Sequence, residues 1–238
     1  MKICYIHGYG SNGLRTGGKL KEAVGVDVEI LGWDSSKPFR ENFKDLLKRV
    51  KKIAKKDDEI VLVATSLGCY YARAIAENEY CELNLFNPCF KPWELTDIIP
   101  PEISKTYDYE FNKSIGIAMA IFVSEEDEVI PNNVESVKEM FGGRCYIEVT
   151  KEKHRIESFE KYKDKILDTS FFLRNDMLSV DEIFLRERDC VVTAMARERQ
   201  IPLCLCLSGI VNLRYKELNS VFEGLVDDML LVISEKMK

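Results

Sequence analysis

The sequence predicts an α/β fold, in which a mostly parallel sheet is covered by helices on both faces. Short apolar runs alternate along the chain with stretches whose apolar residues recur every three or four positions. The first pattern indicates buried strands, and the second indicates amphipathic helices. Strands that alternate with helices favour a parallel sheet, because parallel neighbours need a crossover connection between them.

The predicted strands are apolar runs bounded by glycine, proline or charged residues. In chain order they are Lys2–Ile6, Asp27–Leu31, Ile60–Val63, Glu82–Phe86, Ile115–Val123 and Arg144–Val149. Most of them lack an alternation of apolar and polar residues, as expected for strands that are buried on both faces.

The predicted helices lie between these strands. The first has one apolar stripe and an opposite face rich in lysine and arginine. That pattern has two interpretations, a basic anion-binding surface or a solvated helix face. The solvated face is the more common explanation of such a pattern. Further helices are expected over Leu67–Glu77 and over Asn133–Phe141, where Gly142 and Gly143 end the helix. The stripe consists of Phe43, Leu46, Leu47, Val50, Ile53 and Ala54.

Two segments depart from the alternating pattern. Residues 87–114 are long, rich in proline and aromatic residues, and weakly periodic, which is typical of a functional loop such as a lid. Residues 169–238 form a C-terminal helix–strand–helix extension, with helices expected over Val180–Arg199 and Tyr215–Ile233 and a strand over Pro202–Leu207. The expected organisation is therefore a core of residues 1–168 and an extension of unassigned role.

Composition narrows the class of protein. The 238 residues carry a net charge of −6, which argues against an electrostatic nucleic-acid footprint. The apolar run before His7 is too short for a signal-peptide core, and no run approaches the roughly 20 residues of a membrane helix. Eight cysteines without a C-x-x-C pair suggest reduced, buried thiols. We expect a cytoplasmic protein with no membrane or nucleic-acid partner.

The sequence "ATSLG", Ala64–Gly68, joins a predicted strand to a predicted helix. It resembles the pattern G-x-S-x-G, the sharp strand-to-helix turn that exposes a nucleophilic serine in α/β-hydrolases. Ser66 is the candidate nucleophile. The competing interpretation is structural, because Thr65 or Ser66 could cap the helix that follows.

The chain has two histidines, and a serine hydrolase needs one imidazole to take and return a proton. In α/β-hydrolases the chain order is serine, acid, histidine. His7 precedes Ser66 and does not fit. His154 follows the last predicted strand, at the carboxyl edge of the sheet where ligands bind in open α/β folds.

The acid should lie between Ser66 and His154, just after a strand. The sequence "VSEEDEV" offers several carboxylates there, of which Asp127 is favoured and Glu125 stays open. Its role would be to hold the imidazole in one tautomer. The oxyanion would bind the backbone N–H of Leu67 at a helix N-terminus and a second N–H from the glycine-rich loop after the first strand, for which Tyr9 is the candidate.

Several longer motifs resemble those of the YqiA/YcfP-type esterases, which are small α/β-hydrolases. They are "YIHGYGSN", "TSLGCYYA", "FNPCFKPWELT", "DEV" at Asp127–Val129, and His154 followed by "FEKYKDKILD". The resemblance spans about Lys2 to Asp168. It implies a Ser66, Asp127 and His154 triad, hydrolysis of carboxylic esters or thioesters, and no metal or cofactor.

The chain departs from that family pattern at three places. Ala64 and Cys69 replace glycines at the turn, and Lys151-Glu152-Lys153 replaces a glycine-containing run before His154. The last change affects the loop that aims the imidazole. It motivates an alternative hypothesis, in which the hydrolase fold serves binding or assembly with an impaired triad.

The sequence therefore predicts an α/β-hydrolase-like serine esterase or thioesterase that acts on a small acyl substrate without a cofactor. Four aromatic residues of the 87–114 segment are candidates for an acyl pocket, although an ordinary packed loop would also explain them. They are Phe90, Trp93, Tyr107 and Tyr109. The oligomeric state is not indicated.

Overall fold

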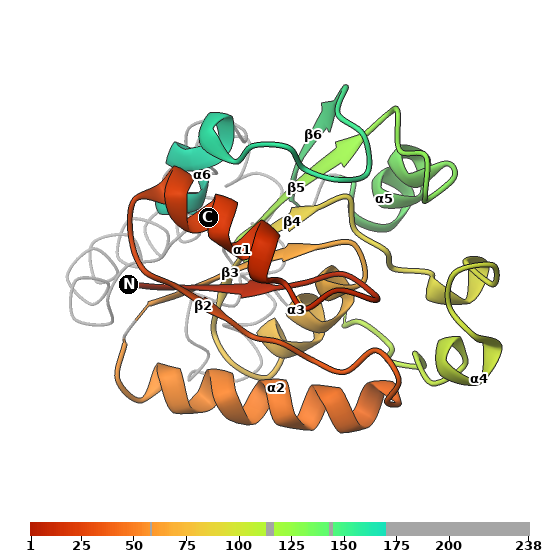
Figure 1. The fold of residues 1–238 in the computed structure, drawn as a ribbon, viewed down its shortest axis with the longest axis horizontal. Helices are drawn as coiled ribbons and strands as arrows, with labels where there is room; N and C mark the ends of the chain where they lie inside the picture. The colour runs from red at the N-terminus through yellow and green to blue at the C-terminus, as the bar shows by residue number, and fades with distance from the viewer. Residues whose placement is uncertain (58, 113–116, 143–144, 170–238) are drawn as a thin grey trace, which may run out of the picture.

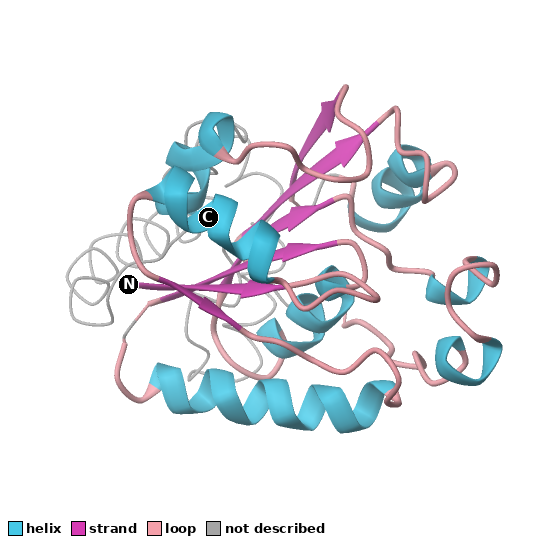
Figure 2. Cartoon of the chain, viewed as in Figure 1, coloured by secondary structure: helices cyan, strands magenta, loops and turns pink. Residues whose placement is uncertain are grey.

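The computed structural model describes residues 1–57, 59–112, 117–142 and 145–169 of the chain. Within these residues, six strands form one parallel sheet in the order β2-β1-β3-β4-β5-β6, with helices on both faces (Figures 1 and 2). The predicted α/β fold with a mostly parallel sheet is confirmed. The predicted C-terminal helix–strand–helix lies outside the described residues, apart from Thr169.

The strands agree closely with the apolar runs of the sequence. They are β1 Lys2–Ile6, β2 Val28–Ile30, β3 Ile60–Thr65, β4 Glu82–Phe86, β5 Met119–Ser124 and β6 Tyr146–Thr150. Each adjacent pair is parallel, so the carboxyl ends of all six strands meet at one edge. The loops that carry the predicted site residues follow β1, β3, β5 and β6, and therefore leave the sheet at this edge.

The helices divide between the two faces of the sheet. Apolar residues of α1 and α6 pack against one face, and those of α2, α3 and α5 pack against the other. Alternate residues of each central strand enter the two cores, as the pleat of a strand requires. The helices are α1 Leu14–Val24, α2 Phe39–Ala54, α3 Gly68–Ala76, α4 Pro101–Ser104, α5 Asn133–Phe141 and α6 Lys163–Leu167, with short 3-10 turns η1 Pro92–Glu94 and η2 Glu160–Tyr162.

Helix α1 has no counterpart among the helices expected from sequence. It contains Gly17 and Gly18, which weaken the helical signal because glycine is a poor helix former. Gly17 packs closely on β2: a Cβ atom there would lie 2.8 Å from the Ile30 Cδ1 atom, so the Ile30 side chain would have to shift. Glycine at this position therefore favours the close approach of α1 to β2, and the same residue weakens the helical pattern in the sequence.

Helix α2 begins at Phe39, four residues before the apolar stripe that predicts it. Phe39 follows Pro38 and is buried among the rings of Tyr70, Tyr71 and Tyr107. The lysines of the opposite face are exposed to solvent.

The segment after β4 packs on α3 through an aromatic and ionic network. Arg73 and Glu77 of α3 form a buried ion pair. Arg73 donates to the Asn112 carbonyl, and the Glu77 carboxylate accepts from the Tyr109 hydroxyl. The Tyr71 and Tyr107 hydroxyls share a hydrogen bond 2.9 Å long. Since burying an unpaired charge is costly, these contacts hold the segment firmly against the helix.

The five cysteines in the described ranges are free and buried, as the sequence predicts. Burial raises the pKa of the Cys4 and Cys89 thiols to about 12. In the same ranges no helix combines the length and the apolar character that crossing a membrane requires.

Gly68 lies at the start of α3, against the end of β1. A Cβ atom at this position would lie 2.4 Å from the Ile6 carbonyl oxygen and 2.5 Å from that of His7. These are backbone atoms that cannot move aside cheaply. We expect Gly68→Ala to lower the free energy of unfolding by about 1–3 kcal/mol, the usual cost of overpacking, as measured by urea denaturation.

Gly18→Ala is the matched control, because a Cβ atom there meets nothing within 4 Å. In an exposed helix interior this change should raise the free energy of unfolding by about 0.5–1 kcal/mol. Equal stability of the two variants would contradict the proposed packing of α3 against the end of β1.

Candidate active site

Ser66 occupies a sharp turn between β3 and α3. Its φ of 52° lies in the left-handed region, which non-glycine residues rarely adopt. Its N–H donates to the Phe86 carbonyl of β4, and its carbonyl accepts from the Cys89 N–H. Leu67 is the N-cap residue of α3 and no side chain caps the helix. The structural interpretation of Ser66 or Thr65 as an N-cap is therefore not observed.

The loop after β1 lies directly against Ser66. A Cβ atom added at Gly8 would lie 2.9 Å from the Ser66 Cβ and 3.4 Å from its hydroxyl oxygen. Only glycine allows this approach, which brings the backbone of Gly8 next to the serine. The same loop passes Gly68, which has no room for a side chain.

Ala64 shows why a glycine is dispensable at that position. It is fully buried in β3, where it pairs with Ile6 of β1 and Leu85 of β4. A methyl group fits between these neighbours, so the departure from the G-x-S-x-G pattern leaves the turn intact.

His7 is buried and holds the loop after β1 in place. Its Nε2 atom accepts from the Trp33 N–H, so its Nδ1 atom carries the proton and donates to the Gly8 carbonyl. The Trp33 indole stacks on the imidazole and donates to the His7 carbonyl. Burial lowers the pKa of His7. Both ring nitrogens are occupied, which agrees with the exclusion of His7 on chain order.

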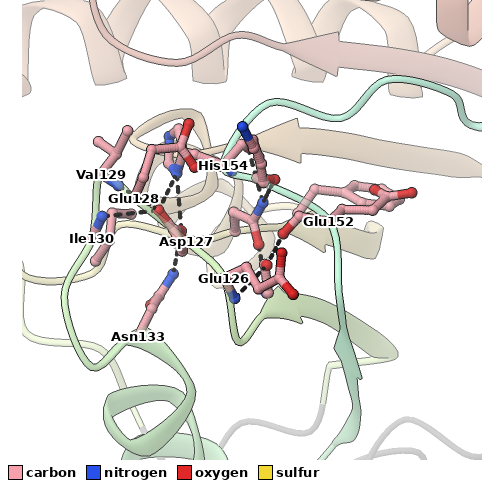
Figure 3. Close-up of polar contacts among 12 residues, drawn as sticks. Glu126, Asp127, Glu128, Val129, Ile130, Asn133, Glu152 and His154 are labelled. Carbon is pink, nitrogen blue, oxygen red and sulfur yellow. Dashed lines mark hydrogen bonds and ion pairs between the residues drawn. The ribbon is translucent and has the colours of Figure 1, made fainter.

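Asp127 lies in the loop after β5, and its carboxylate is engaged on several sides (Figure 3). One oxygen accepts from the Val129 and Ile130 N–H groups, each at 2.9 Å, and the other accepts from the Asn133 amide at 3.3 Å. The side chain is only 2% exposed. These hydrogen bonds hold the Asp127 carboxylate in one orientation.

The imidazole of His154 meets this carboxylate. Its Nδ1 atom lies 2.9 Å from both Asp127 oxygens, and the imidazole is 12% exposed. Burial by itself would raise the pKa of Asp127, but the hydrogen bond and charge of His154 and the N–H donors at Ile130 and Val129 outweigh it, and the pKa is lowered. The pair therefore favours an ionised Asp127 with Nδ1–H directed at it.

The other carboxylates of the "EEDE" run have different contacts. Glu125 is exposed, and its N–H donates to the Thr150 carbonyl. The Glu128 carboxylate accepts from the His154 backbone N–H at 2.9 Å, and this bond lowers the pKa of Glu128. Glu128 is one of the carboxylates that the sequence offers in this run, but its contact with the His154 backbone is not predicted from sequence. Beneath this loop is a polar hollow of about 400 Å³, lined by Glu125, Asn132, Glu135 and Lys138 among others.

The charged run before His154 is held by its neighbours. The Ser124 hydroxyl donates to the Glu152 carbonyl, and the Glu152 carboxylate pairs with Lys161 at 2.6 Å. The side-chain amide of Asn87 donates to the carbonyls of Lys153 and His154. These contacts fix a loop in which glycines are replaced by long side chains.

The four aromatic candidates for an acyl pocket have different environments. Phe90 and Tyr107 are buried, and Tyr109 packs on Phe39 and bonds to Glu77. Trp93 is 48% exposed. Trp93 is therefore the one of these four rings with a large surface available to a ligand.

No group of three or more His, Cys, Asp or Glu side chains in the described ranges is arranged to hold a metal ion. The backbone N–H groups suggested for an oxyanion belong to Leu67, at the start of α3, and to Tyr9, next to Gly8.

The model of the family described as "Uncharacterised protein family (UPF0227)" matches residues 2–172. The chain belongs to the UPF0227 family. The sequence motifs indicate the same family, and the matched residues include all of the described ones except Met1. No curated protein sequence matches the chain.

Solved structures share the fold of this UPF0227 chain. Ferulic acid-bound Est1E from Butyrivibrio proteoclasticus has a TM-score of 0.55 and 14% identity, over 73% of this chain and 88% of that chain. A hyperthermophilic esterase from Pyrobaculum calidifontis has a TM-score of 0.52 and 11% identity, over 72% and 74% of the two chains. The architecture is therefore that of α/β-hydrolases.

The contacts of Asp127 predict a pH-dependent contribution to stability. Its pKa in the fold lies below the ordinary value of 3.8, so its contribution is present above that value and is lost as the pH falls through the lower folded pKa. We expect Asp127→Asn to lower the free energy of unfolding by about 1.5–3 kcal/mol at neutral pH, the value of hydrogen bonds to a charged group.

Denaturant unfolding at a series of pH values measures this difference between wild type and variant. It should shrink as the pH falls below 3.8. Glu125→Gln is the control, because an exposed side chain should change stability by about 0.5 kcal/mol at most. A difference for Asp127→Asn that grows toward acid pH would contradict the assigned contacts.

Proposed function

We propose that this UPF0227 protein is a serine hydrolase that cleaves carboxylic ester or thioester bonds of small acyl substrates. The observation that carries the proposal is the Asp127–His154 pair, at 2.9 Å, on the sheet edge where Ser66 stands in a turn with φ of 52°. Acyl transfer by a serine hydrolase requires a serine in a strained turn, an imidazole near it and a buried acid that orients the imidazole.

In the first step Ser66 attacks the acyl carbonyl. Because Nδ1 of His154 carries the proton directed at Asp127, Nε2 is left with a free lone pair that accepts the serine proton. The negative charge of Asp127 stabilises the imidazolium that forms. The imidazolium then gives its proton to the alcohol or thiol that leaves, and an acyl-serine remains.

The tetrahedral oxyanion is bound by the backbone N–H groups of Leu67 and Tyr9. Support comes from two features: Leu67 begins a helix whose dipole favours negative charge, and Gly8 brings the loop of Tyr9 against Ser66. Water then attacks the acyl-serine with His154 as the base, the acid is released, and the serine regains its proton.

Three further observations support this proposal. The chain has the fold of proteins that are named as esterases, among them Est1E and the Pyrobaculum enzyme. The triad residues are those that the family resemblance implies. The backbone of the loop that carries His154 is hydrogen-bonded to the side chains of Ser124, Glu128 and Asn87. The charged run before the histidine is therefore compatible with an ordered imidazole.

The nucleophile is tested with a fluorophosphonate probe, which reacts with activated serines. Wild type should be labelled, and Ser66→Ala should not. Hydrolysis of short-chain p-nitrophenyl esters and acyl thioesters should fall by about 10⁴–10⁶-fold in Ser66→Ala, the range seen when triad members are removed.

Ser158→Ala is the control for this experiment, because Ser158 is an exposed serine in the region after His154. It should keep both labelling and hydrolysis. Labelling of Ser66→Ala to the wild-type extent would exclude Ser66 as the nucleophile.

We further propose that Trp93 contacts the acyl chain of the substrate. Its ring is 48% exposed and sits in η1, which follows β4 at the carboxyl edge of the sheet. A contact of this kind should gain about 0.8 kcal/mol for each methylene that is removed from water.

Trp93→Ala should therefore reduce kcat/KM for long acyl esters more than for acetyl esters, as measured over a series of chain lengths. Tyr80→Ala serves as the control, because Tyr80 is an exposed aromatic residue before β4, at the opposite edge of the sheet. A loss that is independent of chain length would refute this role for Trp93.

A further inference from the structure

Asn87 is the first residue after β4 and is only 1% exposed. Its φ of 44° is in the left-handed region, where asparagine is one of the few tolerated residues with a side chain. A buried polar residue with an unusual backbone conformation needs a compensating set of contacts. Asn87 has such a set, and it connects the segment after β4 with the end of β5 and with the loop after β6.

The side-chain amide of Asn87 uses both its donors and its acceptor. The Nδ2 atom donates to the Lys153 carbonyl at 3.1 Å and to the His154 carbonyl at 2.9 Å. The Oδ1 atom accepts from the Ser124 N–H at 2.7 Å. One side chain therefore ties the end of β5, which leads to Asp127, to the loop that carries His154.

The backbone on either side of Asn87 holds the candidate nucleophile. The Phe86 carbonyl accepts from the Ser66 N–H at 2.9 Å, and the Cys89 N–H donates to the Ser66 carbonyl at 3.1 Å. Ser66 is thus fixed by residues within two positions of Asn87. The same short segment contacts all three elements that carry the triad.

His154 is restrained at three points by different residues. Its carbonyl accepts from Asn87, its N–H donates to Glu128, and its Nδ1 atom donates to Asp127. Of these contacts, the one with Asn87 leads back to the strand beside Ser66. Without it, His154 and Asp127 would remain hydrogen-bonded to each other. The Asn87 side chain would then no longer fix their position relative to Ser66.

We propose that Asn87 is a positioning residue, which sets the His154 loop relative to Ser66 through its side-chain amide. This inference rests on the proposed hydrolase function. The side chain must be an amide, because an aspartate at this position would turn an acceptor toward two carbonyl oxygens. A glycine would accept the same φ without strain but would supply no hydrogen bond.

Asn87→Gly therefore separates the amide from the backbone conformation. In kinetic measurements on the full chain with a p-nitrophenyl ester, we expect kcat to fall by about 10²-fold, the usual effect of a displacement near 1 Å. KM should stay near the wild-type value, because no substrate contact is removed. Asn87→Asp should show a larger fall in kcat than Asn87→Gly. Rates are normalised to the fraction of protein that reacts with the fluorophosphonate at completion.

A second measurement does not depend on activity. The chain has two histidines, so the imidazole N–H protons of protein with ¹⁵N-labelled histidine can be assigned directly. His154 should give a low-field signal for the proton held by Asp127. In Asn87→Gly this signal should broaden or shift, while that of His7, which bonds to the Gly8 carbonyl, stays unchanged as an internal reference.

Asn84→Ala is the control variant. Asn84 is a fully buried asparagine of β4, the strand that precedes Asn87, and its amide donates to Thr169, away from the predicted triad residues. It should lose stability and keep the wild-type kcat and His154 signal.

The positioning role is overturned if Asn87→Gly keeps both wild-type properties, if it fails to fold, or if Asn84→Ala changes them equally. If wild type hydrolyses no ester, or Ser66→Ala retains full hydrolysis, the proposed function fails, while the His154 signal still reports on Asn87.

Discussion

The site depends on one constraint: parallel strands must end together at the same edge of the sheet. The register achieves this, since Ile6 pairs with Ala64, Thr65 with Phe86, Phe86 with Phe122, and Ser124 with Thr150. The loops after these pairs then begin side by side. A slip of one residue in any pair would reverse the faces of a strand and displace its loop.

Hydrogen bonds between these loops turn this shared edge into a defined geometry. Asp127 is held by the backbone of its own loop and by Asn133, and it holds the imidazole of His154. Asn87 and Ser124 tie the histidine loop to the strands beside it. Polar groups that are buried and satisfied in this way favour one arrangement, because every alternative leaves some of them unpaired.

The sequence predicts the sheet well because its four central strands, β1, β3, β4 and β5, are buried on both faces and therefore stand out as apolar runs. Helix α1 is not predicted, since Gly17, which packs closely on Ile30, weakens the helical pattern. Chain order selects His154 and places the acid in the run after β5, where Asp127 is favoured and Glu125 stays open, and the family resemblance implies Asp127. The contacts of Asn87 and Glu128 with the His154 loop are not predicted, because they join residues that are distant in the chain.

We propose that Ser66, His154 and Asp127 act together at this edge: His154 carries the proton between Ser66 and the leaving group, and Asp127 orients the imidazole. A crystal structure of the phosphonate-treated protein tests it most directly. We expect the phosphorus atom on the Ser66 hydroxyl oxygen, the phosphoryl oxygen at the Leu67 and Tyr9 N–H groups, and the His154 imidazole between the adduct and Asp127. An adduct on another residue, or an imidazole turned into solvent with Asp127 unpaired, would contradict the claim.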